Sequence, residues 1–339
     1  MKLLVCTSIV AVLVVNGYAQ MPRQLLKYPA KLTIKVKTDE YKPVGNVTVG
    51  VSTFDHWVPG EGFGKDSHTT RTAITDGDGI ASIEMPSLDG EFGVRVRHEK
   101  GYYRDRGRDY RFKEVKEGRW QPWNPTIDIV FKPIENPIPM FAKNVGQMPN
   151  PIELPIKNKP IGFDLIKGDW VVPYGVGNTP DIVFSLVEEV PFVSADKVFS
   201  SILKIQFSNP LDGIQSVLSP LNGESAMRLP RFAPEDGYRG KLEKRFGRFA
   251  EGIRIESAIQ EDQNYFIRVR SIVDEKGRIV SANYGKIIGD ISCDVINSKT
   301  GYIQFSYCLN PTSLDRNMEF DPGRNLFTNL TWGQGVLVP

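Results

Sequence analysis

The stretch KLTIKVK, residues 31–37, alternates apolar and polar side chains without a break. Its apolar members Leu32, Ile34 and Val36 fall on one face of an extended chain, because successive side chains of a strand point to opposite faces. The stretch therefore predicts a strand that is buried on one face only. The same alternation recurs in VTVGVS (47–52), GVRVRH (93–98) and TIDIVF (126–131). Together these stretches predict a sandwich of short antiparallel strands over residues 28–135.

A second stretch, TDGDGIASIE at residues 75–84, has the composition of a calcium-binding loop. An EF-hand loop needs oxygen ligands at its first, third and fifth positions and a glutamate at its twelfth. Placing Asp76 and Asp78 at the third and fifth positions puts Ile74 at the first and Met85 at the twelfth, and neither side chain can bind calcium. Asp and Gly also supply the backbone conformations of a tight strand connection. The stretch therefore predicts a turn, with an irregular calcium site as the alternative.

The order of these signals resembles that of the carboxypeptidase regulatory-like domain. PVGNVTVGV, TDGDGIASIEMP, GEFGVRV and GYY follow one another between residues 43 and 103, and an alternating strand closes the series. The resemblance implies an immunoglobulin-like or transthyretin-like sandwich, which in many exported proteins is a folding and binding module without catalytic residues of its own. Two long excursions, residues 54–70 and 104–118, depart from the pattern at loop positions.

The chain begins with the features of a secretory signal peptide. Lys2 precedes the apolar stretch 3–15, and Gly17 and Ala19 place small residues at a cleavage site. Residues 1–19 are therefore predicted to be removed, and no later stretch is apolar enough to span a membrane. We expect a protein that is secreted, periplasmic or held at the cell surface. A formal net charge of +2 gives no general attraction to nucleic acid.

Beyond the first domain, a proline-rich segment at residues 136–160 predicts a stiff linker, or a strap laid over a neighbouring domain. Residues 161–339 contain many strand-like stretches separated by turn residues and predict a second β-rich domain, whose family we do not recognise. Within it, GYRGKLEKRFGRFAEG at residues 237–252 has the composition of a short helix. The fold class expected from the sequence is therefore all-β, with an N-terminal sandwich and a second β-rich domain.

After leader removal two cysteines remain, Cys293 and Cys308, and an oxidising compartment favours one disulfide between them. They flank a stretch that predicts a hairpin. A two-residue loop would place them opposite each other, whereas matching the apolar faces of the two strands would place Cys293 opposite Tyr307. A β-bulge could reconcile the two registers.

Motifs of known catalytic chemistry are weak in this sequence. Ser201–Lys204, Ser281–Asn283 and Lys299–Gly301 occur in the order of a penicillin-binding pattern, but the first lies on a predicted strand and not on a helix. The three histidines accompany no nucleophile motif, and neither zinc-ligand spacings nor a phosphate-binding loop occur in the sequence. We therefore expect a protein without a cofactor or metal that is not an enzyme, with a secreted hydrolase or lyase acting through the second domain as the alternative.

One constellation of side chains suggests binding. GYYRDRGRDYRF and GRWQPWNP interleave arginines with five aromatic residues that could stack on a sugar or contact a protein, namely Tyr102, Tyr103, Tyr110, Trp120 and Trp123. Our preferred interpretation is that Tyr103 and Trp120 pack the loop onto the core. The sequence thus predicts an exported protein that engages a surface polymer, a carbohydrate or a protein partner, or a subunit of an extracellular assembly. Asn46 and Asn329 begin sequons that matter only in a host that glycosylates.

Overall fold

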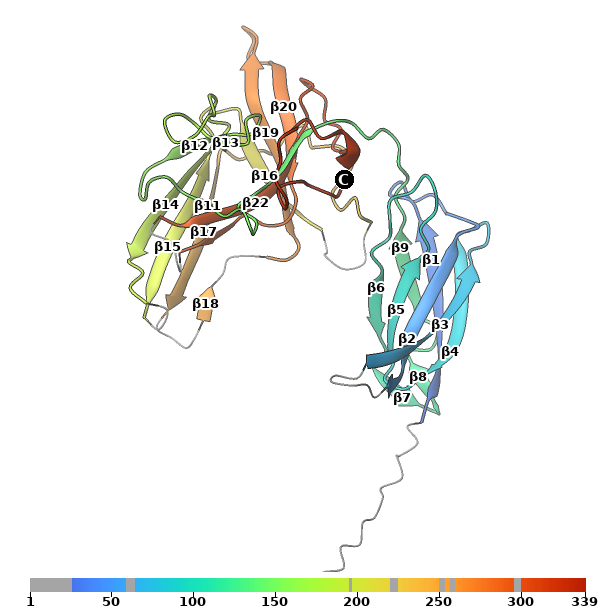
Figure 1. Ribbon diagram of the computed structural model, residues 1–339. Helices are drawn as coiled ribbons and strands as arrows, with labels where there is room; N and C mark the ends of the chain where they lie inside the picture. The colour runs from blue at the N-terminus through green and yellow to red at the C-terminus, as the bar shows by residue number, and fades with distance from the viewer. Residues whose placement is uncertain are drawn as a thin grey trace, which may run out of the picture.

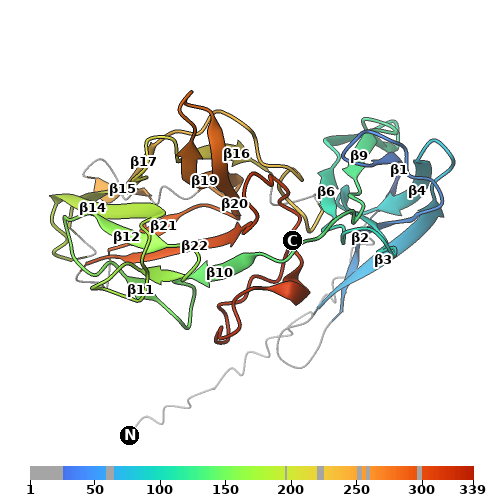
Figure 2. The same cartoon turned by 90° about the horizontal axis from the view of Figure 1, so that it is seen from above.

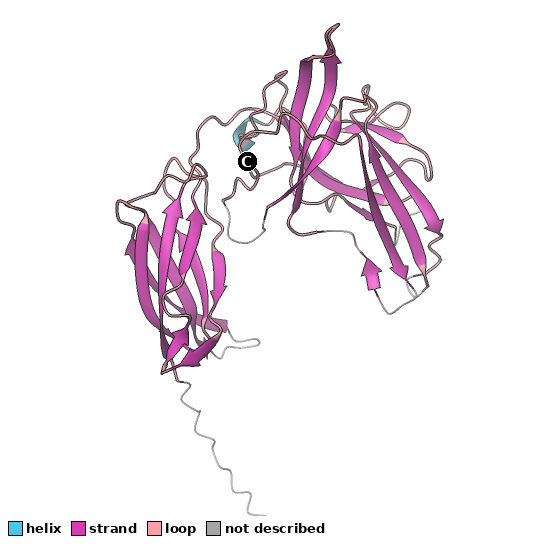
Figure 3. Cartoon of the chain, turned by 180° about the vertical axis from the view of Figure 1, so that it is seen from behind, coloured by secondary structure: helices cyan, strands magenta, loops and turns pink. Residues whose placement is uncertain are grey.

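The chain folds into two β-sheet lobes joined end to end (Figure 1). The computed structural model describes residues 26–58, 65–194, 197–219, 225–249, 254–256, 260–295 and 300–339. Strands and loops make up nearly all of it (Figure 3), and the only helical element among these residues is a 3-10 turn, Pro322–Arg324. The prediction of an all-β chain with an N-terminal sandwich and a second β-rich domain is confirmed. The predicted signal peptide lies outside the described residues.

Two sheets form the N-terminal sandwich. One has the order β4-β1-β9 and the other the order β3-β2-β5-β6, and a two-stranded sheet, β7-β8, lies beside them. Strand β1 pairs antiparallel with β4 but parallel with β9. The sequence predicted only antiparallel strands, so the parallel pair differs from that prediction. The strands are β1 Tyr28–Lys37, β2 Thr48–Val58, β3 Lys65–Ile74, β4 Ile80–Ser87, β5 Glu91–Val96, β6 Arg108–Arg111, β7 Glu114–Lys116, β8 Arg119–Gln121 and β9 Thr126–Val130.

The core of this sandwich is built from the alternating positions that the sequence marked. Leu32, Ile34 and Val36 are fully buried, and they pack in one cluster with the apolar residues of β2, β5 and β9. The outward positions between them are polar or small. The periodicity of two therefore decides both the strands and the face that each strand buries.

Within the stretch 75–84, residues 75–79 form the turn that connects β3 to β4, and residues 80–84 begin β4. Oδ1 of Asp76 accepts hydrogen bonds from the amides of Asp78 (3.0 Å) and Ile80 (2.9 Å). Gly79 has a φ of +74°, and a Cβ there would lie 2.3 Å from the carbonyl oxygen of Val36. A left-handed backbone in close contact with a neighbouring strand requires glycine at this position. The prediction of a turn is confirmed.

The two excursions from the family pattern also form strands. Residues 54–58 and 65–70 extend β2 and β3 into a ribbon whose register runs to Val58 opposite Lys65. Residues 104–118 contain β6 and β7. Strand β6 pairs with the edge of β5 and so widens the sheet.

Two larger sheets form the C-terminal lobe (Figure 2). One has the order β10-β22-β20-β19-β16, with β11 and β21 also pairing with β22, and the other has the order β13-β12-β14-β15-β17-β18. A single apolar cluster contains residues of both sheets. The strands are β10 Phe141–Val145, β11 Ile152–Glu153, β12 Ile161–Asp164, β13 Asp169–Trp170, β14 Ile182–Val190, β15 Phe199–Gln206, β16 Gly213–Leu218, β17 Lys241–Phe249, β18 Arg254–Glu256, β19 Gln263–Val273, β20 Ile279–Ile287, β21 Ser292–Asp294 and β22 Tyr302–Leu309.

The proline-rich segment 136–160 is not a free linker. Its proline-free part forms β10, which pairs antiparallel with β22 at the edge of the sheet, and Met140 and Leu154 are buried. The linker prediction is therefore wrong for this stretch, and the alternative of a strap describes it. The expected helix at 237–252 is also wrong, because residues 241–249 form β17. Its residues Lys244 and Phe246 are buried and Glu243 and Arg245 exposed, a period of two that suits a strand.

The two cysteines are both free and buried, so the predicted disulfide is wrong. Cys293 on β21 is opposite Ile303, whereas Cys308 lies five positions further along β22, opposite Lys286. An odd separation along a strand places two side chains on opposite faces. Cys293 accordingly belongs to the main core cluster and Cys308 to a smaller cluster with Met140 and Phe320.

We expect both thiols to be unreactive in the folded protein. Burial raises the pKa of Cys293 to about 12 and that of Cys308 to about 11, so that little thiolate forms at neutral pH. A chromogenic thiol reagent should label neither until denaturant is added, and intact-mass analysis should show no disulfide. Thr69→Cys, at an exposed position of β3, should react at once and serves as the control. A disulfide in the secreted protein would contradict the described register.

Candidate functional site

A groove crosses the outer face of the sheet β3-β2-β5-β6. Val49 and Val51 of β2 point inward, so Gly50 and Ser52 point outward. On the neighbouring strand β5, Val94 points inward and Gly93 outward. Small residues at adjacent outward positions of the two central strands leave this face hollow.

The groove consists of two hollows that share Gly50 and Arg95. The first has a volume of about 530 Å³ and the second about 410 Å³. The first is lined in addition by Ser52, Thr53, Phe54, His68, Thr70, Asp89, Glu91, Phe92, Gly93 and Asp109. The second is lined in addition by Thr48, Thr72, Val96, Arg97, His98, Arg104 and Asp105. Hydroxyl, carboxylate and guanidinium groups dominate this lining.

The two hollows differ in charge. The first carries Asp89, Glu91 and Asp109, of which Asp89 is held by the amide of Glu91 (3.0 Å) and Glu91 pairs with Arg111. The second carries exposed arginines at 95, 97 and 104. Among the described residues, none of these three arginines forms an ion pair. The groove therefore has an acidic end and a basic end.

The position of Arg95 depends on Gly107, which precedes β6. Gly107 has a φ of +76°, and a Cβ there would lie 2.5 Å from Cγ of Arg95. Because glycine lacks that atom, the aliphatic part of Arg95 can rest against the backbone at this point. The side chain is thereby held where the two hollows meet.

Asp105 is an unusual member of the basic end. Its side chain is only 6% exposed, and its Oδ2 accepts a hydrogen bond from the amide of Val96 (2.7 Å). Its Oδ1 is buried and has no hydrogen-bond partner within the described part of the chain. The C-terminal lobe adjoins this point, because the amide of Ala226 donates to the carbonyl of Arg104 (2.8 Å) and Ser225 forms a β-bridge with Asp105.

The five aromatic residues singled out by the sequence are not brought together, and none is among the lining residues of the groove. Tyr102 stacks on Phe131 with centroids 4.5 Å apart, and Tyr110 packs edge-on against Phe112. Nε1 of Trp120 donates a hydrogen bond to the carbonyl of Ser87 (3.1 Å). Arg119 lies over the ring of Trp123. Tyr103 is buried at the junction between the lobes. Trp120 is part of β8 and Trp123 follows it, and β7 and β8 lie at the far end of the sandwich from that junction (Figure 1). Tyr103 and Trp120 thus have the packing role that we preferred.

The junction between the lobes is built around Glu319, whose side chain is fully buried. Its carboxylate accepts hydrogen bonds from the hydroxyl of Tyr103 (2.7 Å) and from the amides of Glu135 (2.8 Å) and Asn136 (2.7 Å). It also pairs with Arg231 at 2.8 Å. Burial and the bond to Glu319 raise the pKa of Tyr103, so its hydroxyl stays protonated and donates. One charge thus connects the sandwich, the segment after it and the C-terminal lobe.

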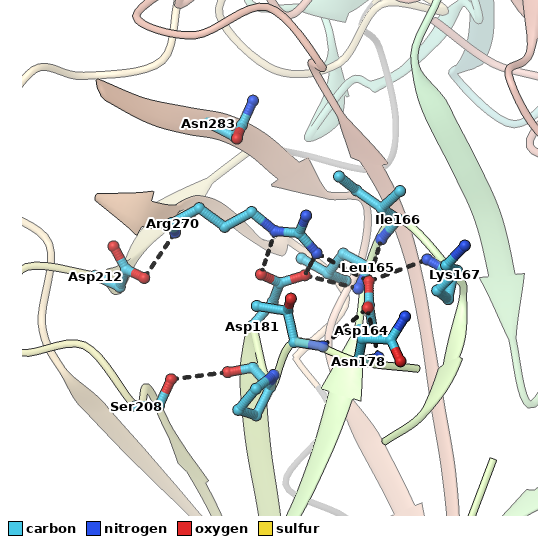
Figure 4. A network of polar contacts seen from close by, with 12 residues as sticks. Asp164, Leu165, Ile166, Lys167, Asn178, Asp181, Ser208, Asp212, Arg270 and Asn283 are labelled. Carbon is cyan, nitrogen blue, oxygen red and sulfur yellow. Dashed lines mark hydrogen bonds and ion pairs between the residues drawn. The ribbon is translucent and has the colours of Figure 1, made fainter. Parts of the chain in front are cut away.

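A second polar network, in the C-terminal lobe, contains the acidic pair Asp164 and Asp181 with Arg270 between them (Figure 4). Arg270 contacts Asp164 at 2.9 Å and Asp181 at 2.7 Å. The remaining bonds of these carboxylates come from the amides of Leu165, Ile166, Lys167, Asn178 and Thr179. Every oxygen of both carboxylates therefore accepts a hydrogen bond. This arrangement fits a structural clamp that joins β12, the start of β14 and β19 better than it fits a general acid–base pair.

Within the described residues, no group of three or more His, Cys, Asp or Glu side chains is arranged to hold a metal ion. In the same part of the chain, no helix is long and apolar enough to cross a membrane. The absence of a metal and of a membrane span stays an expectation from the sequence.

No protein-family model and no curated protein matches the chain. The resemblance of the first domain to carboxypeptidase regulatory-like domains therefore stays a prediction. Among solved structures, BcpA, the major pilin subunit of Bacillus cereus, matches with 12% identity over 84% of this chain and 96% of its own, at a TM-score of 0.23. The full-length major pilin SpaD from Corynebacterium diphtheriae matches with 9% identity over 87% of this chain and 92% of its own, at 0.24. Scores this low do not establish a shared fold, and neither match bears on the function proposed below.

We expect Glu319→Gln to destabilise the protein by about 3 kcal/mol, because it removes the only fully buried anion that pairs with Arg231 in the described part of the chain and leaves it the more exposed Asp39 and Glu135. Guanidinium unfolding followed by tryptophan fluorescence measures the change. Glu243→Gln, at an exposed position of β17, is the matched control and should have little effect. An equal effect of both variants would show that the junction adds no particular stability.

The same residue makes the junction sensitive to acid. Burial alone would raise the pKa of Glu319, but the amides of Glu135 and Asn136, the hydroxyl of Tyr103 and Arg231 together hold it below the ordinary value of 4.5. A lowered pKa in the folded state gives stability that is complete above pH 4.5 and is lost as the pH falls through the folded value. The difference in unfolding free energy between the wild type and Glu319→Gln should therefore shrink on acidification. A difference that stays constant down to about pH 2.5 would contradict this account.

Proposed function

We propose that this chain is an exported, non-catalytic binding protein that holds an extended, polar polymer in the groove of its N-terminal sandwich. The observation that carries the proposal is the groove itself, floored by Gly50, Ser52 and Gly93 between the walls formed by β3 and β6. Glycine at outward strand positions weakens a sheet, by about 0.5–1 kcal/mol each relative to alanine. Two of them on adjacent strands, with Gly50 opposite Arg95 and Gly93 opposite Ser52, stand where threonine or valine would suit the strand better, and they fit a surface shaped for a ligand.

The shape and the lining of the groove define the ligand class. Two hollows that meet at Gly50 and Arg95 along β2 and β5 suit a chain-like ligand better than a compact one. The lining offers hydrogen-bond donors and acceptors such as Ser52, Thr70 and Asp109, and only Phe54 and Phe92 contribute large apolar side chains to the first hollow. A carbohydrate polymer satisfies such a surface.

The C-terminal lobe supports this site in the proposed function. Its loop at residues 225–226 bonds to the backbone at the basic end of the groove. The alternative of a hydrolase acting through this lobe finds no support in its acidic pair, because Arg270 and backbone amides bond to every oxygen of Asp164 and Asp181. Export rests on the leader predicted at residues 1–19.

Filling the floor of the groove tests the proposal. A Cβ at Gly50 would meet only Thr70, Arg95 and Thr72, at 3.9–4.0 Å, so Gly50→Val should fold and place its side chain in both hollows. Valine also suits a strand. We expect the variant to keep the melting temperature of the wild type and to lose polysaccharide binding by at least about tenfold.

Affinity electrophoresis in gels containing dextran, hyaluronan or polygalacturonate measures the binding. Ser82→Val is the matched control, because it places the same side chain at an exposed position of β4 on the opposite sheet. The proposal fails if no polysaccharide retards the wild type, or if Gly50→Val is retarded as strongly as the wild type and Ser82→Val.

A further inference from the structure

We infer that the groove recognises an acidic polysaccharide in which charged sugars alternate with neutral ones. This inference rests on the proposed function, since it names the ligand class of the same site. It is argued from three features of the groove: unpaired cations at one end, a buried acceptor without a donor beside them, and carboxylates at the other end.

Three arginines lie together at the basic end of the groove, where Asp105 is the one carboxylate among the lining residues. Arg95 lies on β5 and Arg97 directly follows the last residue of that strand, and Arg104 comes from the segment beside it. All three are exposed, line the same hollow and form no ion pair with any described residue. Like charges held close together raise the local potential, which an anionic ligand would lower. Guanidinium groups bind carboxylate and sulfate through paired hydrogen bonds.

Asp105 adds a requirement that a simple anion cannot meet. Its Oδ1 is buried and lacks a hydrogen-bond partner in the described part of the chain, although its Oδ2 is bonded to the amide of Val96. A buried acceptor without a donor is unfavourable, so a ligand hydroxyl that reached it would be favoured. A ligand that carries an anionic group and a hydroxyl donor on the same unit fits both the arginines and Asp105. A uronic acid or a sulfated sugar is such a unit.

The opposite end of the groove limits how much charge the ligand can carry. Asp89, Glu91 and Asp109 line the first hollow, and an anion placed there would be repelled. The same carboxylates accept hydrogen bonds from neutral hydroxyls. A polymer with an acidic sugar at the basic end and a neutral sugar at the acidic end therefore suits the groove better than one charged at every unit.

Calorimetry with three polysaccharides tests this inference. Hyaluronan fragments alternate a uronic acid with a neutral amino sugar, polygalacturonate is acidic at every unit, and dextran is neutral. We expect hyaluronan fragments to bind at least about tenfold more tightly than either of the others. Raising sodium chloride from about 50 mM to about 300 mM should weaken that binding, because it screens the arginines.

Arg97→Gln and Arg104→Gln locate the binding. Both residues are exposed, so folding should be unaffected, and each variant should bind hyaluronan at least about fivefold more weakly. Lys35→Gln is the matched control: it removes one exposed cation from β1, on the opposite sheet, and should bind as the wild type does.

The outcomes separate this inference from the proposed function. The inference is overturned if dextran or polygalacturonate binds as tightly as hyaluronan. It is also overturned if Arg97→Gln and Arg104→Gln bind hyaluronan as the wild type does. In either case the groove remains a binding site, provided that Gly50→Val still abolishes binding. Equal binding of inorganic polyphosphate, which has no hydroxyl to offer Asp105, would overturn it as well. If no polysaccharide binds, or if Gly50→Val has no effect, the proposed function fails and this inference fails with it.

Discussion

The buried carboxylate of Glu319 is the constraint on which the arrangement of this molecule depends. A charge removed from water is costly unless donors surround it, and Glu319 receives them from the sandwich, from the segment after it and from the C-terminal lobe. No one of these segments could satisfy the carboxylate alone. Bonds from Lys132 to the carbonyls of Arg228 and Leu229 also join the two lobes. The loop at residues 225–226 lies against the end of the groove in the same arrangement.

The groove shows a compromise within one sheet between stability and a usable surface. Val49, Val51 and Val94 point inward from β2 and β5 and fill the core, whereas Gly50, Ser52 and Gly93 point outward and form the floor of the groove. Each strand glycine costs about 0.5–1 kcal/mol of stability. The core on the inner face offsets this loss of stability, because burying one valine side chain contributes about 1.5 kcal/mol or more to folding. The inner face of each strand thus provides the stability, and the outer face provides the shape.

The sequence predicted what alternation and turn chemistry determine locally. The strands around Leu32, Val49, Val94 and Ile129 and the turn at Asp76 are set by neighbours within a few residues. The linker and the disulfide depended on which strands pair at long range, because β10 and Cys293 find their partners on β22. The groove was missed for the same reason. Gly50 and Gly93 are ordinary residues within their own stretches of sequence. They form the floor of a groove only because β2 and β5 pair with each other in the folded sheet.

The parallel pairing of β1 with β9 has a mechanical consequence. These are the first and last long strands of the sandwich, and Thr33–Lys37 lies in register with Thr126–Val130. Because they run in the same direction, the chain enters the domain at one end and leaves it at the other (Figure 1). Tension along the chain therefore pulls the two strands lengthwise past each other and loads all their hydrogen bonds at once, instead of opening them one by one. The parallel register of β1 with β9 therefore gives the sandwich a geometry that resists stretching along the chain.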